Sequence, residues 1–497
     1  MEMTNILKQI RKNYIIILIL FLGCVLRFIN LEGRCFWCDE FESYNIALQS
    51  VSSTLSSLIR NTPHIPLYYT LLHFWLMLGT SDTLTRTFSS IFGVMTILIS
   101  YHFFKKMFDR KVALLSVFLL AISPFHIMFS RIVREYALTC FLSVCSMFSF
   151  WLVISAKSNR FYKWLIYGVV SFLLVYTHYY CWFIIIAQAI FVLVYKRDKL
   201  RLWIMTNAII FIFFLPWIAL NLWFRLKGEW GSVLATYASS TFGYFIKAAY
   251  FFYSFTLGQT VYPFNLYIVV PLLVVFSIVF IYGVIYLLRE HGQYKKIILF
   301  WLFIPFIIGL FMPACAPRQL LLILPAFCVI LAAGIVRMRY KWGRWIVGAV
   351  IILTFAYSNY NYFTNRQYFD VDMVTPWRAI TDEITVNEQK DDVVLLGRLM
   401  ECFPLYYRGN LPIYRINPFD KPEQIKKYGE KHKRLWILLH SERPRENFEQ
   451  WMRENGEIIL TKKYLYEEDT AKGLKEGFKN IHKYHEYKYK LYLLKLK

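Results

Sequence analysis

The chain contains 497 residues, of which 57% are hydrophobic and only 18% are charged, and its formal net charge is +24. This is more apolar surface than one globular core can bury, so the composition predicts a protein that lipid covers over much of its length. The basic residues lie mainly in short loops between apolar runs, where orientation in a membrane accounts for them. We therefore do not expect nucleic-acid binding.

The charge is unevenly distributed along the chain. Residues 366–497 contain 25 Lys and Arg against 21 Asp and Glu, which leaves 31 against 11 for residues 1–364. The first part is therefore apolar, basic and poor in acids, whereas the last part has the balanced charge of a soluble domain. The first apolar run lacks a small-residue cleavage site, so we expect it to be a true first span and not a signal peptide.

Clusters of Lys and Arg separate apolar runs that approach the roughly 20 residues needed to cross a bilayer. If every basic cluster is cytoplasmic, the spans between the clusters come in pairs. This rule places the N-terminus inside and predicts eleven spans. They are residues 14–29, 85–104, 112–129, 136–155, 162–178, 180–195, 200–220, 265–288, 297–310, 320–336 and 345–357.

Two further apolar stretches, residues 66–79 and 242–257, are short. If either one crossed the bilayer alone, it would invert every loop that follows. We expect both to form helices that lie at the outer interface. The same parity argument places everything after residue 357 outside.

From about Arg366 onward, short β-branched runs alternate with polar helical stretches, which is typical of a small α/β domain. The predicted fold is therefore a polytopic α-helical membrane domain, residues 1–364, followed by an extracytoplasmic α/β domain, residues 365–497. The expected strands are residues 393–397, 412–416, 435–440, 457–461 and 489–494, and the expected helices are residues 377–383, 422–428 and 446–454.

Acidic residues are concentrated in the first predicted outer loop. Only eleven acids precede residue 365, and four of them are Glu32, Asp39, Glu40 and Glu42. A carboxylate at a membrane face can accept a proton from an acceptor group or hold a divalent cation. The alternative is a solvated acidic loop, and the scarcity of acids elsewhere argues against it. The sequence indicates no particular cofactor, although a divalent metal is compatible with these residues.

Five arginines lie on the predicted outer side, against the bias that keeps cations inside. A guanidinium pairs bidentately with phosphate, so a carrier lipid with its phosphate at this interface would account for several of them. The alternative for any one arginine is pairing with nearby acids or with anionic headgroups. These residues are Arg27, Arg34, Arg131, Arg134 and Arg318.

Two histidines and two cysteines also stand near the predicted outer face. His64 precedes Pro66, and His178 lies within a tyrosine-rich segment, although a single membrane histidine is more often structural than chemical. Cys35 and Cys38 are spaced for a metal site, but without a second pair this is weak evidence. A disulfide or no special role is the preferred interpretation of the two cysteines.

The chain resembles the GT-C membrane glycosyltransferases, which use polyprenyl-linked sugars and include protein O-mannosyltransferases and the lipid A aminoarabinose transferase. The resemblance depends on five segments that occur in the same order, over about residues 27 to 334. They are Trp37-Cys38-Asp39-Glu40, His64-Ile65-Pro66-Leu67-Tyr68-Tyr69, Leu84-Thr85-Arg86 to Phe92-Gly93, Ser123-Pro124-Phe125-His126 to Tyr136-Ala137-Leu138, and Pro317-Arg318 to Leu324-Pro325-Ala326.

The resemblance implies a transfer that inverts the sugar anomeric carbon at the outer face, with Asp39 as the base that activates the acceptor and arginines that hold the lipid phosphate. Where many relatives have an acid in the second loop this chain has Ile132, and Glu135 follows Arg134. Gln319 replaces the tyrosine expected after Arg318, and Ile65 replaces the first of two prolines.

The candidate site therefore has two groups of residues. The catalytic candidates are Asp39, Glu40 and Glu135. The substrate-binding candidates are His64, Tyr68, Arg131, Arg134, Tyr136, His178 and Arg318.

The predicted function is sugar transfer from a polyprenyl-phosphate donor to a lipid, glycan or protein acceptor, in what we expect to be a bacterial inner membrane. The alternative is a transporter or flippase for lipid-linked saccharides. Transporters place polar sites near the midplane, whereas the acids and arginines here gather at one face, which favours the enzyme. A non-catalytic scaffold of the cell envelope would leave the acidic loop unexplained.

Overall fold

The computed structural model describes residues 2–60, 64–226, 241–263, 265–290, 292–312, 315–366, 371–397, 400–416, 425–440, 446–464 and 489–497. The chain divides into two compact units, which we describe separately. The helical unit comprises Met1–Leu31, Glu42–Val261 and Tyr267–Phe363, and the sheet unit comprises Glu32–Phe41, Tyr262–Leu266 and Thr364–Lys497.

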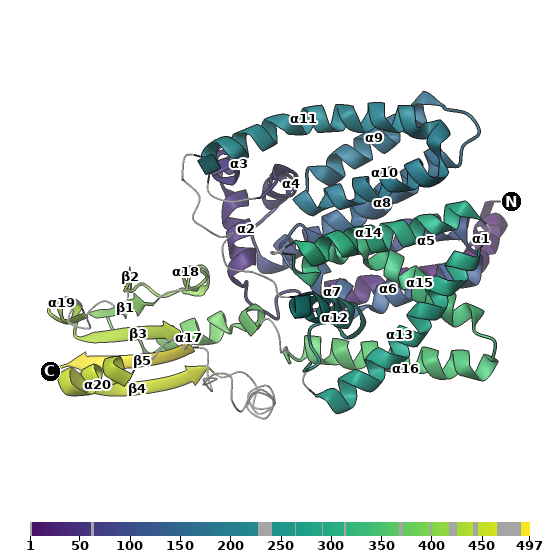
Figure 1. The fold of residues 1–497 in the computed structure, drawn as a ribbon. Coiled ribbons are helices and arrows are strands. Elements are labelled where there is room, and N and C mark those ends of the chain that lie inside the picture. The colour runs from purple at the N-terminus through teal and green to yellow at the C-terminus, as the bar shows by residue number, and fades with distance from the viewer. Residues whose placement is uncertain are drawn as a thin grey trace. The chain divides into compact units, whose positions relative to one another are not determined.

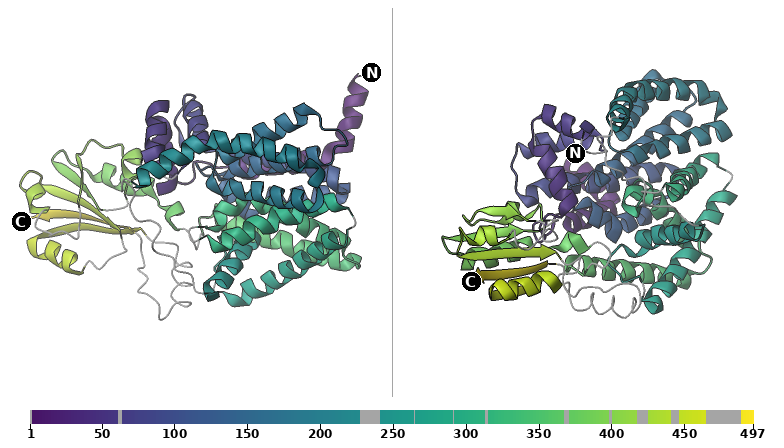
Figure 2. Two further views of the ribbon diagram at one scale, coloured as in Figure 1. Left: turned by 45° about the horizontal axis from the view of Figure 1, so that its top comes forward. Right: turned by 60° about the vertical axis from the view of Figure 1, so that its left-hand side comes forward.

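A helix lies at each of the eleven predicted spans. Seven of the described helices are long and apolar enough to cross a membrane, or eight if the bent pair α6 and α7 is one span, and three shorter apolar helices occupy the other predicted positions. The bounds are α1 Glu2–Phe28, α5 Asp82–Met107, α6 Arg110–Ile122, α7 Pro124–Ser130, α8 Tyr136–Ile154, α9 Phe161–Val175, α10 Trp182–Tyr195, α11 Leu200–Leu226, α13 Leu266–Arg289, α14 Ile297–Phe311, α15 Leu324–Arg337 and α16 Lys341–Phe363. Helices α8 to α11 pack side by side (Figures 1 and 2).

Four further helices belong to the same region of the chain. Helices α4, Pro66–Leu76, and α12, Thr241–Leu257, lie at the two stretches predicted to be interfacial. Helices α2, Cys38–Leu48, and α3, Val51–Arg60, were not predicted. In α3 the apolar residues recur at the helical spacing of positions 51, 55, 58 and 59, so the pattern was present but short.

Two glycines allow helices α13 and α15 to touch through their backbones. A Cβ atom on Gly283 would lie 2.2 Å from the Ile330 carbonyl oxygen, and one on Gly334 would lie 2.3 Å from the Val279 carbonyl oxygen. Neither backbone oxygen can move aside as the end of a side chain could. Small residues therefore set the distance between these helices, as they do in membrane helix pairs generally.

The chain bends by 57° between α6 and α7, where Pro124 cannot continue the helical hydrogen-bond ladder. The carbonyls freed at the end of α6 are satisfied by buried Arg27, whose Nη1 donates to Ala121 O at 3.0 Å and whose Nη2 donates to Leu120 O at 3.3 Å. Arg131 likewise donates to Leu26 O and Asn30 O at the end of α1, both at 3.1 Å. Arg27 thus holds the backbone at the bend, whereas Arg131 holds the end of α1.

The sheet unit contains a five-stranded sheet in the order β2-β1-β3-β5-β4. Strand β1 pairs in parallel with β2 and β3, whereas β5 pairs antiparallel with β3 and β4. All five strands lie where the sequence predicts them. Their bounds are β1 Asp392–Leu396, β2 Ile413–Arg415, β3 Arg434–His440, β4 Gly456–Tyr464 and β5 Tyr489–Leu496.

Alternate residues of the strands face two separate cores. Val394 and Leu396 pack on one face with Trp377 of helix α17, Trp377–Asn387, whereas Val393 and Leu395 pack on the other with Met452 of helix α20, Glu446–Asn455. The predicted helices 377–383 and 446–454 are thereby confirmed. Of the predicted helix 422–428, residues 422–424 lie outside the described residues, and helix α19, Lys426–Gly429, covers the end. Helix α18, Phe403–Tyr406, was not predicted.

Candidate active site

A short link between helices α7 and α8 brings Arg134 and Glu135 into the interior of the helical unit. The link is held by serines of α5, because Ser90 Oγ donates to Ser130 O at 3.2 Å and Ser89 Oγ donates to Arg134 O at 3.4 Å. A Cβ atom on Gly93 would lie 2.5 Å from Ser130 Oγ. Small side chains on α5 therefore let the link approach, and this burial leaves Arg134 only 5% and Glu135 only 2% exposed.

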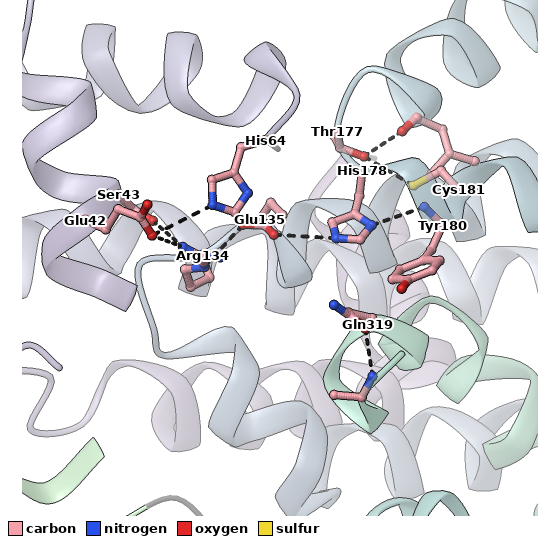
Figure 3. A network of polar contacts seen from close by, with 12 residues as sticks. Glu42, Ser43, His64, Arg134, Glu135, Thr177, His178, Tyr180, Cys181 and Gln319 are labelled. Carbon is pink, nitrogen blue, oxygen red and sulfur yellow. Dashed lines mark hydrogen bonds and ion pairs between the residues drawn. The ribbon is translucent and has the colours of Figure 1, made fainter. Parts of the chain in front are cut away.

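Arg134 is the centre of a group of ion pairs that Figure 3 shows from close by. Its Nη1 donates to Ser43 Oγ at 3.3 Å and lies 3.5 Å from Glu42 Oε2. Its Nε lies 3.5 Å from Glu135 Oε2. The single guanidinium therefore joins helix α2, which carries Glu42 and Ser43, to the link that precedes α8. We call Glu42, Ser43, His64, Arg134, Glu135 and His178 the Arg134 cluster.

Two histidines complete the Arg134 cluster from opposite ends (Figure 3). His64 Nε2 lies 3.8 Å from Glu42 Oε2, and His178 Nε2 lies 3.9 Å from Glu135 Oε1. A backbone hydrogen bond from Leu67 N to Tyr176 O, 3.1 Å, ties the segment that holds His64 to the segment that holds His178. Residues that are more than one hundred positions apart in the sequence are thus brought together.

Burial and charge determine the protonation of these groups. Burial favours the neutral form of Glu135, but Arg134, His64 and His178 outweigh it and lower its pKa to about 2. The neighbouring His64 imidazole lowers the pKa of Glu42. Burial lowers the pKa of His178 to about 4, against the opposing effect of Glu135. At neutral pH both glutamates are therefore ionised and His178 is neutral.

The tautomer of His178 follows from its neighbours. The backbone N–H of Tyr180 donates to His178 Nδ1 at 3.2 Å, and the Tyr180 ring stacks on the imidazole with centroids 5.0 Å apart. Because Nδ1 is the acceptor, the neutral ring carries its proton on Nε2, the atom that faces Glu135. His178 therefore presents a donor to the centre of the cluster.

The aromatic candidates lie around the cluster. The Tyr68 hydroxyl lies 3.1 Å from Ser89 Oγ, so it fixes helix α4 against α5. The Arg134 guanidinium lies 6.0 Å from the Tyr136 ring centroid, at the edge of cation–π range. Tyr69, which the sequence did not single out, is buried beside the same charges, and burial raises its pKa well above the ordinary value.

The two remaining arginine candidates occupy different positions. Arg131 is engaged by the carbonyls at the end of α1 and stacks over the Phe363 ring, 4.9 Å from its centroid. Arg318 lies in the 3-10 helix η4, Pro317–Ile323, which packs against the 3-10 helix η1, Tyr179–Cys181, directly after His178. Its neighbour Gln319 accepts the Ala316 N–H at 2.7 Å and lies below His178 and Tyr180 in Figure 3.

Asp39 and Glu40 stand in the first turn of helix α2. They belong to the segment Glu32–Phe41 of the sheet unit, whereas the rest of α2 from Glu42 belongs to the helical unit. Glu40 is 1% exposed and Asp39 is half-buried. Glu42 is the functional candidate that the sequence did not select, although it lies in the acidic loop. Recognising α2 as a helix would have placed it one turn from Asp39.

No metal site is formed by the residues with described positions, since none of their His, Cys, Asp and Glu side chains cluster in groups of three or more that could hold an ion.

Comparison with known proteins agrees with this arrangement. The family model for dolichyl-phosphate-mannose-protein mannosyltransferases matches residues 62–220, which include His64, Arg134, Glu135 and His178. The fold is similar to that of ArnT from Cupriavidus metallidurans bound to undecaprenyl phosphate, with a TM-score of 0.60 and 11% identity over 97% of this chain and 98% of that chain. No curated protein matches the sequence.

The fold is also similar to that of the Archaeoglobus fulgidus oligosaccharyltransferase in its apo form, with a TM-score of 0.52 and 13% identity over 87% of this chain and 70% of that chain. The two solved structures share their fold with this chain, and the family match covers four of the six residues of the Arg134 cluster, because Glu42 and Ser43 precede it. Residues 62–220 therefore match this family model, and the whole chain shares its fold with these two solved structures.

Proposed function

We propose that this enzyme transfers a sugar from a polyprenyl-phosphate donor to an acceptor at the outer face of a bacterial inner membrane, with inversion at the anomeric carbon. The observation that carries the proposal is the Arg134 cluster, in which a buried guanidinium, two ionised glutamates and two histidines converge. Buried charges of this kind are costly to maintain for stability alone and are concentrated at functional sites.

The spacing of the cluster suits a ligand with several oxygens. Its contacts, 3.3 to 3.9 Å, are longer than the 2.7 to 2.9 Å of a closed charge-assisted hydrogen bond. Arg134 and the Nε2–H of His178 supply donors directed at the centre of the cluster. In our proposal they hold the phosphate of the carrier lipid as the leaving group, and Arg318 supplies further positive charge from η4.

The base must be a carboxylate that is ready to accept a proton. Glu135, with its pKa near 2, is too weak a base for this role, and we assign to it the positioning of Arg134 and His178. We propose Asp39 as the base. Within helix α2 it lies three and four residues before Glu42 and Ser43, so the three side chains share one face of the helix.

The proposed step conserves atoms and charge. An acceptor hydroxyl or amine forms a bond to the anomeric carbon on the face opposite the phosphate, while the bond from that carbon to the phosphate oxygen breaks. Asp39 takes the proton of the acceptor, and the polyprenyl phosphate leaves with the bonding pair. Positive groups near the phosphate stabilise the charge that develops there.

The test is sugar transfer by the purified protein in liposomes that contain lipid-linked saccharides from its host. Mass spectrometry of lipid-linked saccharides that accumulate in cells without the protein identifies the donor to supply. Formation of a glycosylated product together with free polyprenyl phosphate is the expected result. Movement of intact donor to the other leaflet, without any product, would contradict the proposal and favour a flippase.

One feature of the helical unit bears on the flippase alternative. A buried polar network lies among helices α8 to α11, where Tyr167 OH donates to Gln188 Oε1 at 2.8 Å and Asn207 Nδ2 donates to Tyr167 OH at 3.0 Å. These three side chains are uncharged and satisfy one another, so they serve helix packing. The charged residues of the Arg134 cluster instead favour chemistry on a phosphate-linked substrate.

A further inference from the structure

Two neighbouring cysteines, Cys35 and Cys38, lie close to the distant Cys402 within the sheet unit. Cys35 and Cys402 are both buried in the core that also contains Trp377, and the Cys402 thiol forms a hydrogen bond with the Cys38 thiol. Cys35 has another partner, because its sulfur accepts the backbone N–H of Arg378 at 3.4 Å. The spacing of Cys35 and Cys38 favours a local pair, but the structure instead brings Cys38 to Cys402.

The surroundings hold these sulfurs in place. Phe36 N donates to the Tyr406 hydroxyl at 2.6 Å, and Arg378 Nη1 donates to Glu32 O at 2.6 Å, so the segment Glu32–Phe41 is bound on both sides of Cys35 and two residues before Cys38. Cys402 stands immediately before helix α18 and is fully buried. The two thiols are therefore presented to each other by ordered backbone and not by two flexible loops.

We propose that Cys38 and Cys402 form a disulfide that covalently ties the first turn of helix α2 to the sheet unit. The bond would hold the turn that carries Asp39 and Glu40. This proposal rests on the proposed function, in which transfer occurs at the outer face, and on the predicted outer placement of the residues after 357. Disulfides persist in oxidising compartments outside the cytoplasm, which is where that placement puts both thiols.

The reaction is a thiol–disulfide exchange with an oxidised dithiol carrier of that compartment. Half-buried Cys38 meets the oxidant and forms a mixed disulfide, and the sulfur of Cys402 then attacks the sulfur of Cys38. The two thiols lose two electrons and two protons, and the carrier leaves as a dithiol. The hydrogen bond to Cys38, burial, and the charges of Glu40 and Glu401 raise the pKa of Cys402, so its thiolate is scarce and its attack on Cys38 is the slow step of the exchange.

The decisive experiment maps thiols in the full-length protein. Purified protein in detergent is treated with oxidised glutathione, free thiols are blocked with N-ethylmaleimide, and the protein is digested and analysed by mass spectrometry. We expect one linked peptide pair, Cys38 to Cys402. A Cys35–Cys38 link, or alkylation of both Cys38 and Cys402 after oxidation, overturns the proposal. So does bound zinc that is lost in each of C35S, C38S and C402S.

Variants separate the pairing from general disruption. The link is expected to survive in C35S, and also in the control C145S, whose cysteine lies in helix α8. It is expected to be absent in C402S, in which Cys38 becomes open to alkylation. Reductant is expected to lower the Tm of the wild-type protein and to leave that of C402S unchanged. The wild-type protein by itself shows whether the Cys38–Cys402 link forms, so the proposal can still be tested if one variant folds poorly.

A second arm traps thiols directly in growing cells. A Cys38–Cys402 link in cells supports the disulfide and the outer placement of the sheet unit together. If the link forms with glutathione in the purified protein but is absent in cells, the proposed disulfide does not exist in cells. The outer placement of the sheet unit is then contradicted as well. Sugar transfer is measured separately in liposomes, so a failure of the disulfide and a failure of the proposed enzyme activity are distinguishable.

Discussion

His178 Nε2 and Glu135 Oε1 lie 3.9 Å apart, with the imidazole proton directed into the space between them. The ring is held by Tyr180 and the carboxylate by the link before α8, so the backbone on each side fixes this pair. Because a neutral donor lies beside an ionised carboxylate, protonation of either group changes the pKa of the other. This relationship leads to the first prediction.

Acid is expected to destabilise the folded protein through His178. Its pKa is about 4 in the folded state against an ordinary value of 6.5, so the unfolded chain binds this proton more readily. Stability is therefore lost as the pH falls from about 6.5 to about 4, by at most about 3 kcal/mol. H178Q should weaken this dependence, measured as Tm against pH, whereas H102Q, at an exposed histidine, should keep it. An unchanged profile in H178Q would contradict the assignment.

Arg134 is expected to require its planar, forked side chain. R134K keeps the charge but cannot reach Ser43, Glu42 and Glu135 together, so we expect kcat/KM to fall by about 100-fold, which corresponds to about 3 kcal/mol. The control is R289K, at the exposed last residue of helix α13, which should retain full activity. Equal activity of the two variants would exclude Arg134 from the site.

The two glutamates of the cluster, Glu42 and Glu135, are expected to differ in how much stability is lost when each charge is removed. E135Q removes the charge from a fully buried partner of Arg134 and should lower both activity and Tm, with a cost of about 3 kcal/mol for the uncompensated charge. E42Q affects a side chain that is 42% exposed and should cost less stability, about 1 kcal/mol or under. Thermal unfolding and sugar transfer are measured on both. A greater loss of Tm in E42Q than in E135Q would contradict the expectation that Glu135 contributes more to stability.

Asp39 is expected to act in the chemical step. D39N should abolish base catalysis, so we expect the turnover rate to fall by about 100-fold or more, with little change in Tm. D82N, at the first turn of helix α5, is the matched control and should remain active. Full transfer by D39N in liposomes would remove Asp39 from the mechanism.

The contact between helices α13 and α15 is expected to tolerate no side chain at Gly283. G283A would place a methyl group 2.2 Å from the Ile330 carbonyl oxygen, so the helices must separate, and we expect a loss of about 1 to 3 kcal/mol in stability. G348A is the matched control, because nothing lies within 4 Å of a Cβ atom there. Similar melting temperatures for the two variants would show that the contact is looser than described.

The sequence by itself determined the class of the fold. Apolar runs of membrane length and alternating runs after Arg366 are local patterns, so helices at the eleven predicted spans and all five strands of the sheet could be placed from them. The short helix α2 was missed because polar residues interrupt its apolar spacing, and α3 was missed because its regular pattern covers only ten residues. The count of spans and their orientation remain predictions from the positive-inside rule.

Only the tertiary structure decided which of the candidate residues meet. Glu42, His64, Arg134 and His178 come from four separate segments, and no local pattern states that one guanidinium joins them. Arg27 and Arg131 looked alike as outer cations, yet Arg27 satisfies carbonyls at a proline bend and Arg131 satisfies carbonyls at the end of α1. A charged side chain binds whatever oxygen the fold brings near, so its partner depends on contacts between residues distant in the sequence.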